Sequence, residues 1–279
     1  MKQIDEKRFL KRRLVEANKS TYGKMIIVGG SLAYPGSILL ASEAALTTGV
    51  GYVALGIKRD IYPVVATRIK EVIYQVFDSF KDEASLAKLL KYDTIVFGNG
   101  FVDEDSAYAL SYLLKYFEGN LVIDASGLDT LKEVGLNQLL KTKAQVILTP
   151  HYGEFTRLFD IEEKIELPKR VGVLKELASK YHVTIDLKDY ISFVSDGFHF
   201  MTLKNGSCGL AKAGSGDMLA GLIGGFITHI KKDPLAVTYF AHFIMNQASL
   251  ELENEISTHS FTSSKVISKI PEVIKKYEY

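Results

Sequence analysis

Short apolar runs rich in β-branched residues alternate with helical segments along almost the whole of this 279-residue chain. Such runs are typical of parallel strands buried on both faces, and parallel strands need crossover connections long enough for a helix. The alternation therefore predicts an α/β fold, a three-layer α/β/α sandwich with a mostly parallel central sheet whose last strands are partly antiparallel. The expected strands are Met25–Gly29, Tyr52–Ile57, Val72–Phe77, Thr94–Phe97, Leu121–Asp124, Gln145–Leu148, Val183–Lys188, Ser192–Ser195 and Phe198–Leu203.

The expected helices are small or aliphatic stretches bounded by capping and turn residues. Gly49, for example, closes the first of them. No repeat, low-complexity tract or long Pro/Ser linker interrupts the pattern, so we expect a single domain over residues 1–279. The helices are Ser37–Thr48, Ile61–Arg68, Glu83–Leu90, Asp103–Phe117, Glu154–Phe159, Pro168–Tyr181, Asp217–Ile230, Pro234–Glu253 and Thr262–Tyr277.

Composition argues against several classes of partner. The formal net charge is +1 and the Lys and Arg residues are scattered, so the chain has no nucleic-acid footprint. The single cysteine, Cys208, rules out an internal disulfide and fits a reducing compartment. Residues 1–8 are charged where a secretory signal needs an apolar core, and the longest glycine-rich apolar stretch, 218–227, is about half of a bilayer span. We therefore expect a cytoplasmic protein that binds neither nucleic acid nor membrane.

The segment from Gly209 to Gly221 reads GLAKAGSGDMLAG, a glycine-rich turn that leads into an apolar helix. Converging backbone N–H groups and the positive end of the helix dipole make such a turn a candidate phosphate site. A carboxylate there would repel a phosphate unless it takes a proton from the hydroxyl that attacks that phosphate. Asp217 is therefore a candidate general base, although the helix dipole alone also favours an Asp in a first turn.

Three glycines lie inside the helix that follows this turn, at Gly221, Gly224 and Gly225. Each costs about 1 kcal/mol relative to alanine in a helix interior. Their presence predicts that another backbone or a bulky ligand packs very closely against this helix.

Other polar residues follow the expected strands, where ligands bind in open parallel sheets. Asp124 could cap the next helix or help to hold Mg²⁺, and the sequence favours the cap. Glu154 is favoured in the first turn of a helix, so this segment could simply start one. The presence of His151 and Glu154 in one loop after a strand also allows a role in ligand binding. Lys188 fits a phosphate contact and a solvated strand end equally well. The positions expected beyond the carboxyl ends of the strands are Gly30, Gly98, Asp124, His151, Lys188 and the loop before Asp217.

Several motifs together resemble the ADP/ATP-dependent NAD(P)H-hydrate dehydratases, and the likeness runs from about residue 20 to 270. The Gly-Ser-Gly-Asp turn is shared with all ribokinase-like kinases, whereas the Thr-Pro-His-x-Gly-Glu-Phe segment and the Tyr-Pro-Gly loop are more specific. The motifs are Tyr22–Lys24, Gly29–Ser31, Tyr34–Gly36, Phe97–Gly100, Asp124–Leu128, Thr149–Phe155, Leu187–Lys188 and Ala213–Gly221.

The resemblance implies a ribokinase-like fold and repair of (6S)-hydrated NADH or NADPH, with ADP or ATP as phosphoryl donor and Mg²⁺ as a further cofactor. It implies phosphorylation of the added hydroxyl followed by elimination of phosphate. It also implies a homo-oligomer, often a tetramer. Some relatives carry an N-terminal epimerase domain, but too few residues precede Tyr22 for one, so we expect any epimerase to be a separate protein.

The motif match assigns roles to individual residues, with Asp217 as the catalytic base at the reacting hydroxyl. It assigns no residue to a metal. The hydrated dinucleotide would contact Gly36, Ser37, Gly98, Gly100, His151 and Asp217. The adenine nucleotide would contact Lys188, Asp189, Tyr190, Ile191, Ser192, Ala213, Gly214, Ser215 and Gly216, with the amides of 213–216 on the transferred phosphate.

The chain departs from the family pattern at three positions. Asn99 stands where a proline is usual, Asp189 where a glycine commonly follows the lysine, and Ser126 where a second acid is frequent. These differences concern the contacts around Lys188 and Asp124 more than the class of reaction.

Two other functions use the same motifs. A ribokinase-like kinase for a small vitamin alcohol would employ the same turn and base but release a stable phosphate ester. A nucleotide-sensing module without turnover would bind the nucleotide alone, and the presence of Asp217 argues against it.

Overall fold

A computed structural model of the chain describes residues 4–204 and 206–279, so the first three residues of the charged N-terminal segment lie outside it. Within this part of the chain, nine strands form one sheet in the order β3-β2-β1-β4-β5-β6-β7-β8-β9. Neighbouring strands from β3 to β7 pair in parallel, whereas β8 is antiparallel to both β7 and β9. The strands are β1 (Lys24–Val28), β2 (Tyr52–Lys58), β3 (Ile73–Phe77), β4 (Thr94–Phe97), β5 (Asn120–Ile123), β6 (Gln145–Leu148), β7 (Thr184–Leu187), β8 (Ser192–Ser195) and β9 (Phe200–Leu203).

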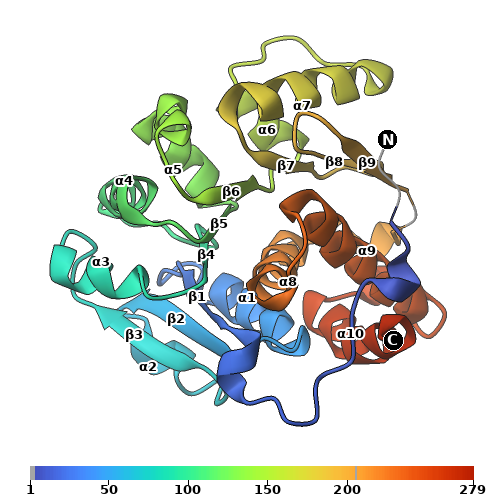
Figure 1. Cartoon of the computed structure of the whole chain (residues 1–279), viewed down its shortest axis with the longest axis horizontal. Coiled ribbons are helices and arrows are strands. Elements are labelled where there is room, and N and C mark those ends of the chain that lie inside the picture. Colours follow the sequence, from blue (N-terminus) through green and yellow to red (C-terminus); the bar gives the residue numbers. More distant parts are fainter. Residues whose placement is uncertain (1–3, 205) are drawn as a thin grey trace.

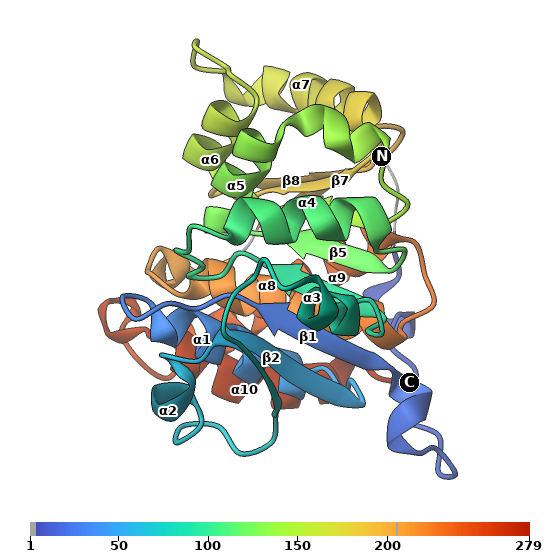
Figure 2. The same cartoon turned by 90° about the vertical axis from the view of Figure 1, so that its left-hand side faces the viewer.

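Helices cover both faces of the sheet, which confirms the expected three-layer α/β/α sandwich. Figure 1 shows α3 to α7 on one face and α1, α8, α9 and α10 on the other, and Figure 2 shows the same layers from the side. The helices are α1 (Pro35–Thr47), α2 (Tyr62–Val65), α3 (Glu83–Leu89), α4 (Ser106–Tyr116), α5 (Ser126–Val134), α6 (Tyr152–Leu158), α7 (Leu167–Tyr181), α8 (Ser215–His229), α9 (Pro234–Glu253) and α10 (Ser263–Tyr277).

Each face of the sheet carries its own hydrophobic core. Successive side chains of a strand point to opposite faces, so a strand that is covered on both sides must be apolar throughout. In β1, Met25 and Ile27 pack in the core beneath α1, α8, α9 and α10, while Ile26 and Val28 pack in the core beneath α3 to α7. The continuous apolar runs of the sequence therefore reflect burial on both faces.

Several element boundaries differ from the sequence prediction. The helix expected over Ile61–Arg68 is limited to Tyr62–Val65. The single proton of the Tyr74 hydroxyl is shared between the carbonyl of Val65, the last residue of this helix (3.3 Å), and the Ile69 carbonyl beyond it (2.8 Å). The helix expected from Asp103 begins at Ser106, since the Asp103 carboxylate accepts the Asp105 N–H at 2.8 Å in a preceding turn. The bounds of α5 were not predicted.

Close packing against α1 and the sheet explains the glycines inside α8. A Cβ built on Gly221 would lie 2.0 Å from the carbonyl oxygen of Ala41 in α1. Built on Gly224 and Gly225, it would lie 2.4 Å from Val96 and 2.3 Å from Thr48. At Gly221 the neighbour is the backbone of α1, as one of the two explanations from the sequence expected, whereas at Gly224 and Gly225 it is the side chains of Val96 and Thr48. These close contacts let α8 lie directly against α1 and the sheet, which fixes where its N-terminus points.

The strand order reverses between β1 and β4, because the chain adds β2 and β3 on one side of β1 and β4 onward on the other. Ligands bind at the carboxyl ends of the strands beside such a switch point. Here the two strand ends are joined by a hydrogen bond from the Gly30 N–H to the Asn99 carbonyl (2.8 Å). The first turn of α8 reaches the same place, since the Asn99 side chain contacts Asp217.

Among the residues that the structure describes, no helix combines the length and the apolar character needed to cross a membrane.

The packing of α8 on α1 can be tested by substitution. Gly221→Ala places a methyl group against the Ala41 carbonyl, so we expect the free energy of unfolding to fall by about 1–3 kcal/mol in urea titrations. Gly172→Ala in α7 is the control, because beyond its chain neighbours and the backbone of its own helix no described residue comes within 4 Å of a Cβ built there. That variant should gain about 0.5–1 kcal/mol from helix propensity. Equal responses of the two variants would contradict the close packing of α8 on α1.

Candidate functional site

Asp217 lies in the first turn of α8, as the sequence predicts. The residue before this helix, Gly214, has a φ of 93°, a left-handed conformation that glycine adopts without strain. Among the residues that the structure describes, no side chain caps this helix, and the Ser215 N–H donates to the Lys212 carbonyl at 3.4 Å. The glycine-rich turn thus presents N–H groups and the positive end of a long helix beside one carboxylate, an arrangement suited to an anion.

A cavity of about 760 Å³ opens in front of this turn. A volume of this size accommodates a nucleotide-sized ligand. Its wall brings together residues from the ends of several strands and from α8 and α9, including Asp124, His151, Lys188, Tyr190, Ser192, Lys212, Ala213, Gly214, Ser215, Gly216, Asp217, His242 and Asn246. Most of the residues expected around the adenine nucleotide therefore line one cavity.

The Asp217 carboxyl group is half-buried, and its surroundings pull its pKa in both directions. Burial raises the pKa most strongly, and the nearby charge of Asp124 adds to this effect. Hydrogen bonding from Asn99 and Ser37 and the charge of Lys188 lower it. The net result is a pKa above the ordinary value of an aspartate, which makes Asp217 a stronger base than an exposed carboxylate.

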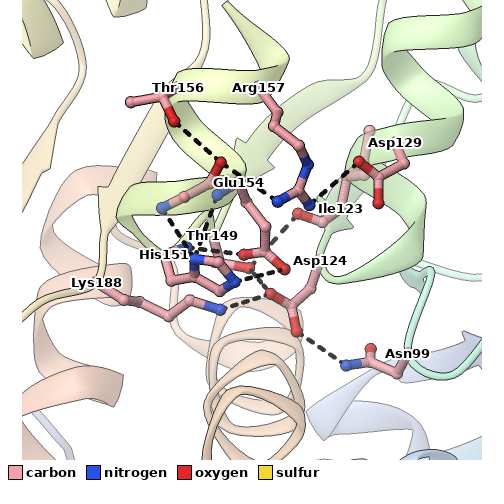
Figure 3. Close-up of polar contacts among 11 residues, drawn as sticks. Asn99, Ile123, Asp124, Asp129, Thr149, His151, Glu154, Thr156, Arg157 and Lys188 are labelled. Carbon is pink, nitrogen blue, oxygen red and sulfur yellow. Dashed lines mark hydrogen bonds and ion pairs between the residues drawn. The ribbon is translucent and has the colours of Figure 1, made fainter. Parts of the chain in front are cut away.

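Asp124 is the hub of a buried polar network (Figure 3). Its Oδ1 accepts hydrogen bonds from the Thr149 hydroxyl (2.7 Å) and the Lys188 ammonium (2.8 Å), and its Oδ2 accepts one from the Asn99 amide (3.0 Å). The prediction that Asp124 caps the next helix is wrong, because α5 begins after Ala125 without a side-chain cap. All three donors bind the carboxylate at once, and each of them lies at the end of a neighbouring strand.

Lys188 is partly buried beside the turn and is not a solvated strand end. Burial by itself would lower the pKa of its ammonium, but the charges of Asp124 and Glu154 outweigh burial and leave the pKa raised. A Cβ built on Gly216 would lie 3.2 Å from the Lys188 Nζ. The Lys188 N–H also donates to the Pro150 carbonyl at 2.9 Å, which fixes its backbone against the end of β6. A charged ammonium is thereby held next to the N-terminus of α8.

His151 starts α6 and also faces the cavity. Its ring nitrogen Nδ1 accepts the N–H groups of Gly153 (3.0 Å) and Glu154 (3.2 Å), and the Glu154 carboxylate accepts the His151 N–H at 2.8 Å. This capping box bears out the helix-start interpretation of the motif. His151 also lines the cavity, and its expected contact with the hydrated dinucleotide stays a prediction.

The remaining residues predicted to contact the hydrated dinucleotide are not part of this cavity wall and lie at the start of α1 and in the loop after β4. Ser37, at the start of α1, interacts with Asp217. Gly98 and Gly100 are buried in the loop after β4, and a Cβ on Gly100 would lie 2.9 Å from that of Ser37. Gly36 is exposed one residue before Ser37.

Two residues near Lys188 are engaged elsewhere in the fold. The Asp189 carboxylate pairs with Arg170 of α7, although the residue still lines the cavity. Ile191 packs against the hydrophobic core beneath α3 to α7 and is absent from the cavity wall.

Two parts of the site escaped the sequence analysis. Asn99 was noted only as a departure from a family pattern, yet its side chain joins Asp124 and Asp217. His242 lines the cavity with its Nδ1 2.9 Å from the Asp186 carboxylate, and both side chains are buried. The available signal was a charged residue inside the apolar strand β7 and a lone histidine inside the apolar helix α9.

The donor groups of the cavity suit a metal ion only when a phosphate accompanies it. In residues 4–204 and 206–279, no three His, Cys, Asp or Glu side chains gather as a metal-binding group. Both oxygens of Asp124 already accept hydrogen bonds. Mg²⁺ commonly keeps several waters and uses one or two carboxylates together with substrate phosphates. The site therefore fits a phosphate-bound Mg²⁺ better than a resident one.

Comparison with known proteins identifies relatives of this chain. The family model described as NAD(P)H-hydrate dehydratase matches residues 25–272. A bifunctional NAD(P)H-hydrate repair enzyme of Pyrobaculum aerophilum is 30% identical over 96% of this chain, which spans about half (53%) of that relative. The ADP-dependent (S)-NAD(P)H-hydrate dehydratase of Bacillus subtilis is 28% identical, with 96% of this chain and 95% of the relative covered.

A solved structure shares the fold as well. It is the ADP/ATP-dependent NAD(P)H-hydrate dehydratase of Bacillus subtilis, co-crystallised with ATP/Mg²⁺, with a TM-score of 0.85, 26% identity and coverage of 98% of this chain and 96% of that one. The fold class and the resemblance that the motifs indicated are thereby confirmed.

The network around Asp124 can be tested through stability. Asp124→Ala leaves the Lys188 ammonium, whose side chain is only 18% exposed, without its carboxylate partner. We expect the free energy of unfolding to fall by about 3 kcal/mol in urea titrations, and the double change Asp124→Ala, Lys188→Met to recover most of the loss. Glu118→Ala, which breaks an exposed pair with Lys143 at a similar distance (2.7 Å), should change little. A single Asp124→Ala variant as stable as the parent would contradict the network.

Proposed function

Because the chain belongs to the NAD(P)H-hydrate dehydratase family, we propose that it converts (6S)-hydrated NADH or NADPH back to NADH or NADPH at the expense of ADP or ATP. One observation carries the proposal. The half-buried Asp217 carboxylate lies at the uncapped N-terminus of α8, in the wall of a cavity of about 760 Å³ that also contains Lys188. This geometry combines a proton acceptor with two features that attract phosphate.

The chemical problem in such a reaction is the leaving group. Hydroxide leaves a carbon atom poorly, whereas a phosphate ester leaves well. Asp217 takes the proton from the substrate hydroxyl while the hydroxyl oxygen attacks the terminal phosphorus of the nucleotide. The bond between that phosphorus and the nucleotide breaks, so ADP yields AMP and ATP yields ADP. The raised pKa of Asp217 favours this role, because a base with a higher pKa accepts the proton more readily.

The anion-binding elements of the cavity hold the phosphate that is transferred. The N–H groups of the turn over residues 213–216 and the positive end of α8 face the developing negative charge. Lys188 supplies a full positive charge beside Gly216. Mg²⁺, when bound to the nucleotide phosphates, would supply further charge neutralisation through those phosphates.

The second stage removes the phosphate from the substrate. The carbon–oxygen bond to the phosphate breaks, the neighbouring ring carbon loses a proton, and the carbon–carbon double bond of the reduced nicotinamide returns. The products are NADH or NADPH, inorganic phosphate, the shortened nucleotide and one proton. Ser37, Gly36, Gly98, Gly100 and His151 are the residues that we assign to the hydrated ring and its attached groups.

The role of Asp217 predicts a specific loss of activity. In Asp217→Asn the side chain keeps its size and its acceptor for the Asn99 amide but cannot take a proton. We expect turnover to fall by about 10²-fold or more, while ADP binding measured by calorimetry stays close to that of the parent. Unchanged turnover would remove Asp217 from the role of base.

The identity of the product distinguishes repair from simple phosphorylation. Incubation of the chain with hydrated NADH and ADP should restore the absorbance of reduced nicotinamide and release one phosphate for each NADH formed. A vitamin-alcohol kinase would use the same base and turn but leave a stable phosphate ester. Accumulation of a phosphorylated product without recovered NADH would therefore contradict the proposed dehydratase activity.

A further inference from the structure

Asn99 lies between the two acids of the site. Its Nδ2 donates to the Asp217 Oδ1 at 2.8 Å and to the Asp124 Oδ2 at 3.0 Å. The residue is fully buried at the end of β4, beside the switch point of the sheet. One amide group thus spans the distance between a carboxylate on α8 and a carboxylate at the end of β5.

The orientation of this amide follows from its neighbours. A side-chain amide has one end that donates two hydrogen bonds and one end that only accepts. The opposite orientation would place the amide oxygen against two carboxylate oxygens, which is repulsive. In the orientation that the acids require, Asn99 Oδ1 is buried and finds no hydrogen-bond partner within residues 4–204 and 206–279. The fold thus leaves a buried polar atom unsatisfied while both N–H bonds are made.

The backbone of Asn99 is held as firmly as its side chain. Its carbonyl accepts the Gly30 N–H at 2.8 Å, and a Cβ built on Gly29 would lie only 2.5 Å from that same oxygen. The ends of β1 and β4 therefore lock the residue in place. An immobile donor is suited to fixing the orientation of a carboxylate on another element.

We propose that Asn99 is a positioning residue for the reaction, holding the Asp217 carboxylate against the cavity wall at a fixed distance from Asp124. This inference rests on the proposed function, because it assigns the general base to Asp217. Asn99 itself does not need to touch the substrate. It acts by aiming the base and by separating two negative charges that would otherwise repel each other.

The charges around Asp217 determine in which direction its pKa shifts when the Asn99 donor is lost. Burial raises the pKa of Asp217 and the Asp124 carboxylate raises it further, while the Asn99 and Ser37 hydrogen bonds and Lys188 lower it. His151 and Glu154 line the same cavity from α6, and Lys212 on the preceding loop points to the carbonyls of His259 (2.7 Å) and Phe261 (2.8 Å). Loss of the Asn99 donor removes the largest of the effects that favour the ionised form.

The test replaces Asn99 with leucine, which has a similar shape and no donor. Carboxyl-carbon NMR of the aspartate-labelled protein follows the titration of Asp217 without any substrate, with Asp217→Asn used to assign the signal. In Asn99→Leu we expect Asp217 to titrate at higher pH than in the parent. We also expect kcat to fall by about 10-fold or more with the KM for ADP within about 2-fold, and the acidic limb of the kcat profile to move to higher pH.

Thr149→Val is the matched control. It removes one buried donor to Asp124, at 2.7 Å, but none to Asp217. We expect the titration of Asp217 and the acidic limb of kcat to stay at the parent values in this variant. If Asn99→Leu does not fold, Asn99→Ala removes the donor with less bulk and the same shifts are expected.

Three results would overturn the role of Asn99: an unmoved Asp217 titration in the variants, a fall in kcat with an unchanged pH profile, or equal responses of Asn99→Leu and Thr149→Val. Failure of the proposed function is recognised separately, because the parent protein would then fail to form NADH from the hydrate. The NMR titration remains a test of the Asn99–Asp217 contact in that case.

Discussion

The structure depends on one buried carboxylate that joins the ends of four neighbouring parallel strands. Asp124 follows β5 and accepts hydrogen bonds from Asn99 after β4, Thr149 after β6 and Lys188 after β7. A carboxylate with a side-chain exposure of 1% is stable only when charge and hydrogen bonds compensate for the lost water, and both are present around Asp124. The strand ends that must converge to form a ligand site are therefore tied together by the same contacts that satisfy this charge.

The second constraint is the approach of α8. Because glycines at three positions let this helix lie against α1 and the sheet, its N-terminus reaches the switch point between β1 and β4. Packing thereby delivers Asp217 to the Asp124 network, and Asn99 connects the two. The result is a carboxylate, the base of our proposal, held beside the positive end of a helix and a lysine whose positive charge the neighbouring acids maintain. The same few residues therefore contribute both to the stability of the fold and to the proposed chemistry.

Much of this arrangement could be predicted from the sequence, for physical reasons. Apolar runs buried on both faces indicated the order and type of most elements, and the Gly-Ser-Gly-Asp turn located Asp217 at the start of a helix. Contacts between distant segments could not be predicted from local sequence. Asp124 was expected to cap its own helix, because pattern analysis cannot anticipate that Lys188, 64 positions away, binds the carboxylate. Asn99 and the Asp186–His242 pair were missed for the same reason, although a charged residue inside β7 and a histidine inside α9 were visible signals for the pair.

The most direct test of the central claim follows the oxygen atom of the substrate hydroxyl. Hydrated NADH carrying ¹⁸O at that hydroxyl is incubated with the chain and ADP, and the inorganic phosphate is examined by ³¹P NMR for the isotope shift. If Asp217 activates the hydroxyl for attack on phosphorus, the label leaves with the phosphate. If the label appears in water and the phosphate is unlabelled, the hydroxyl was never phosphorylated, and Asp217 does not activate it for phosphoryl transfer.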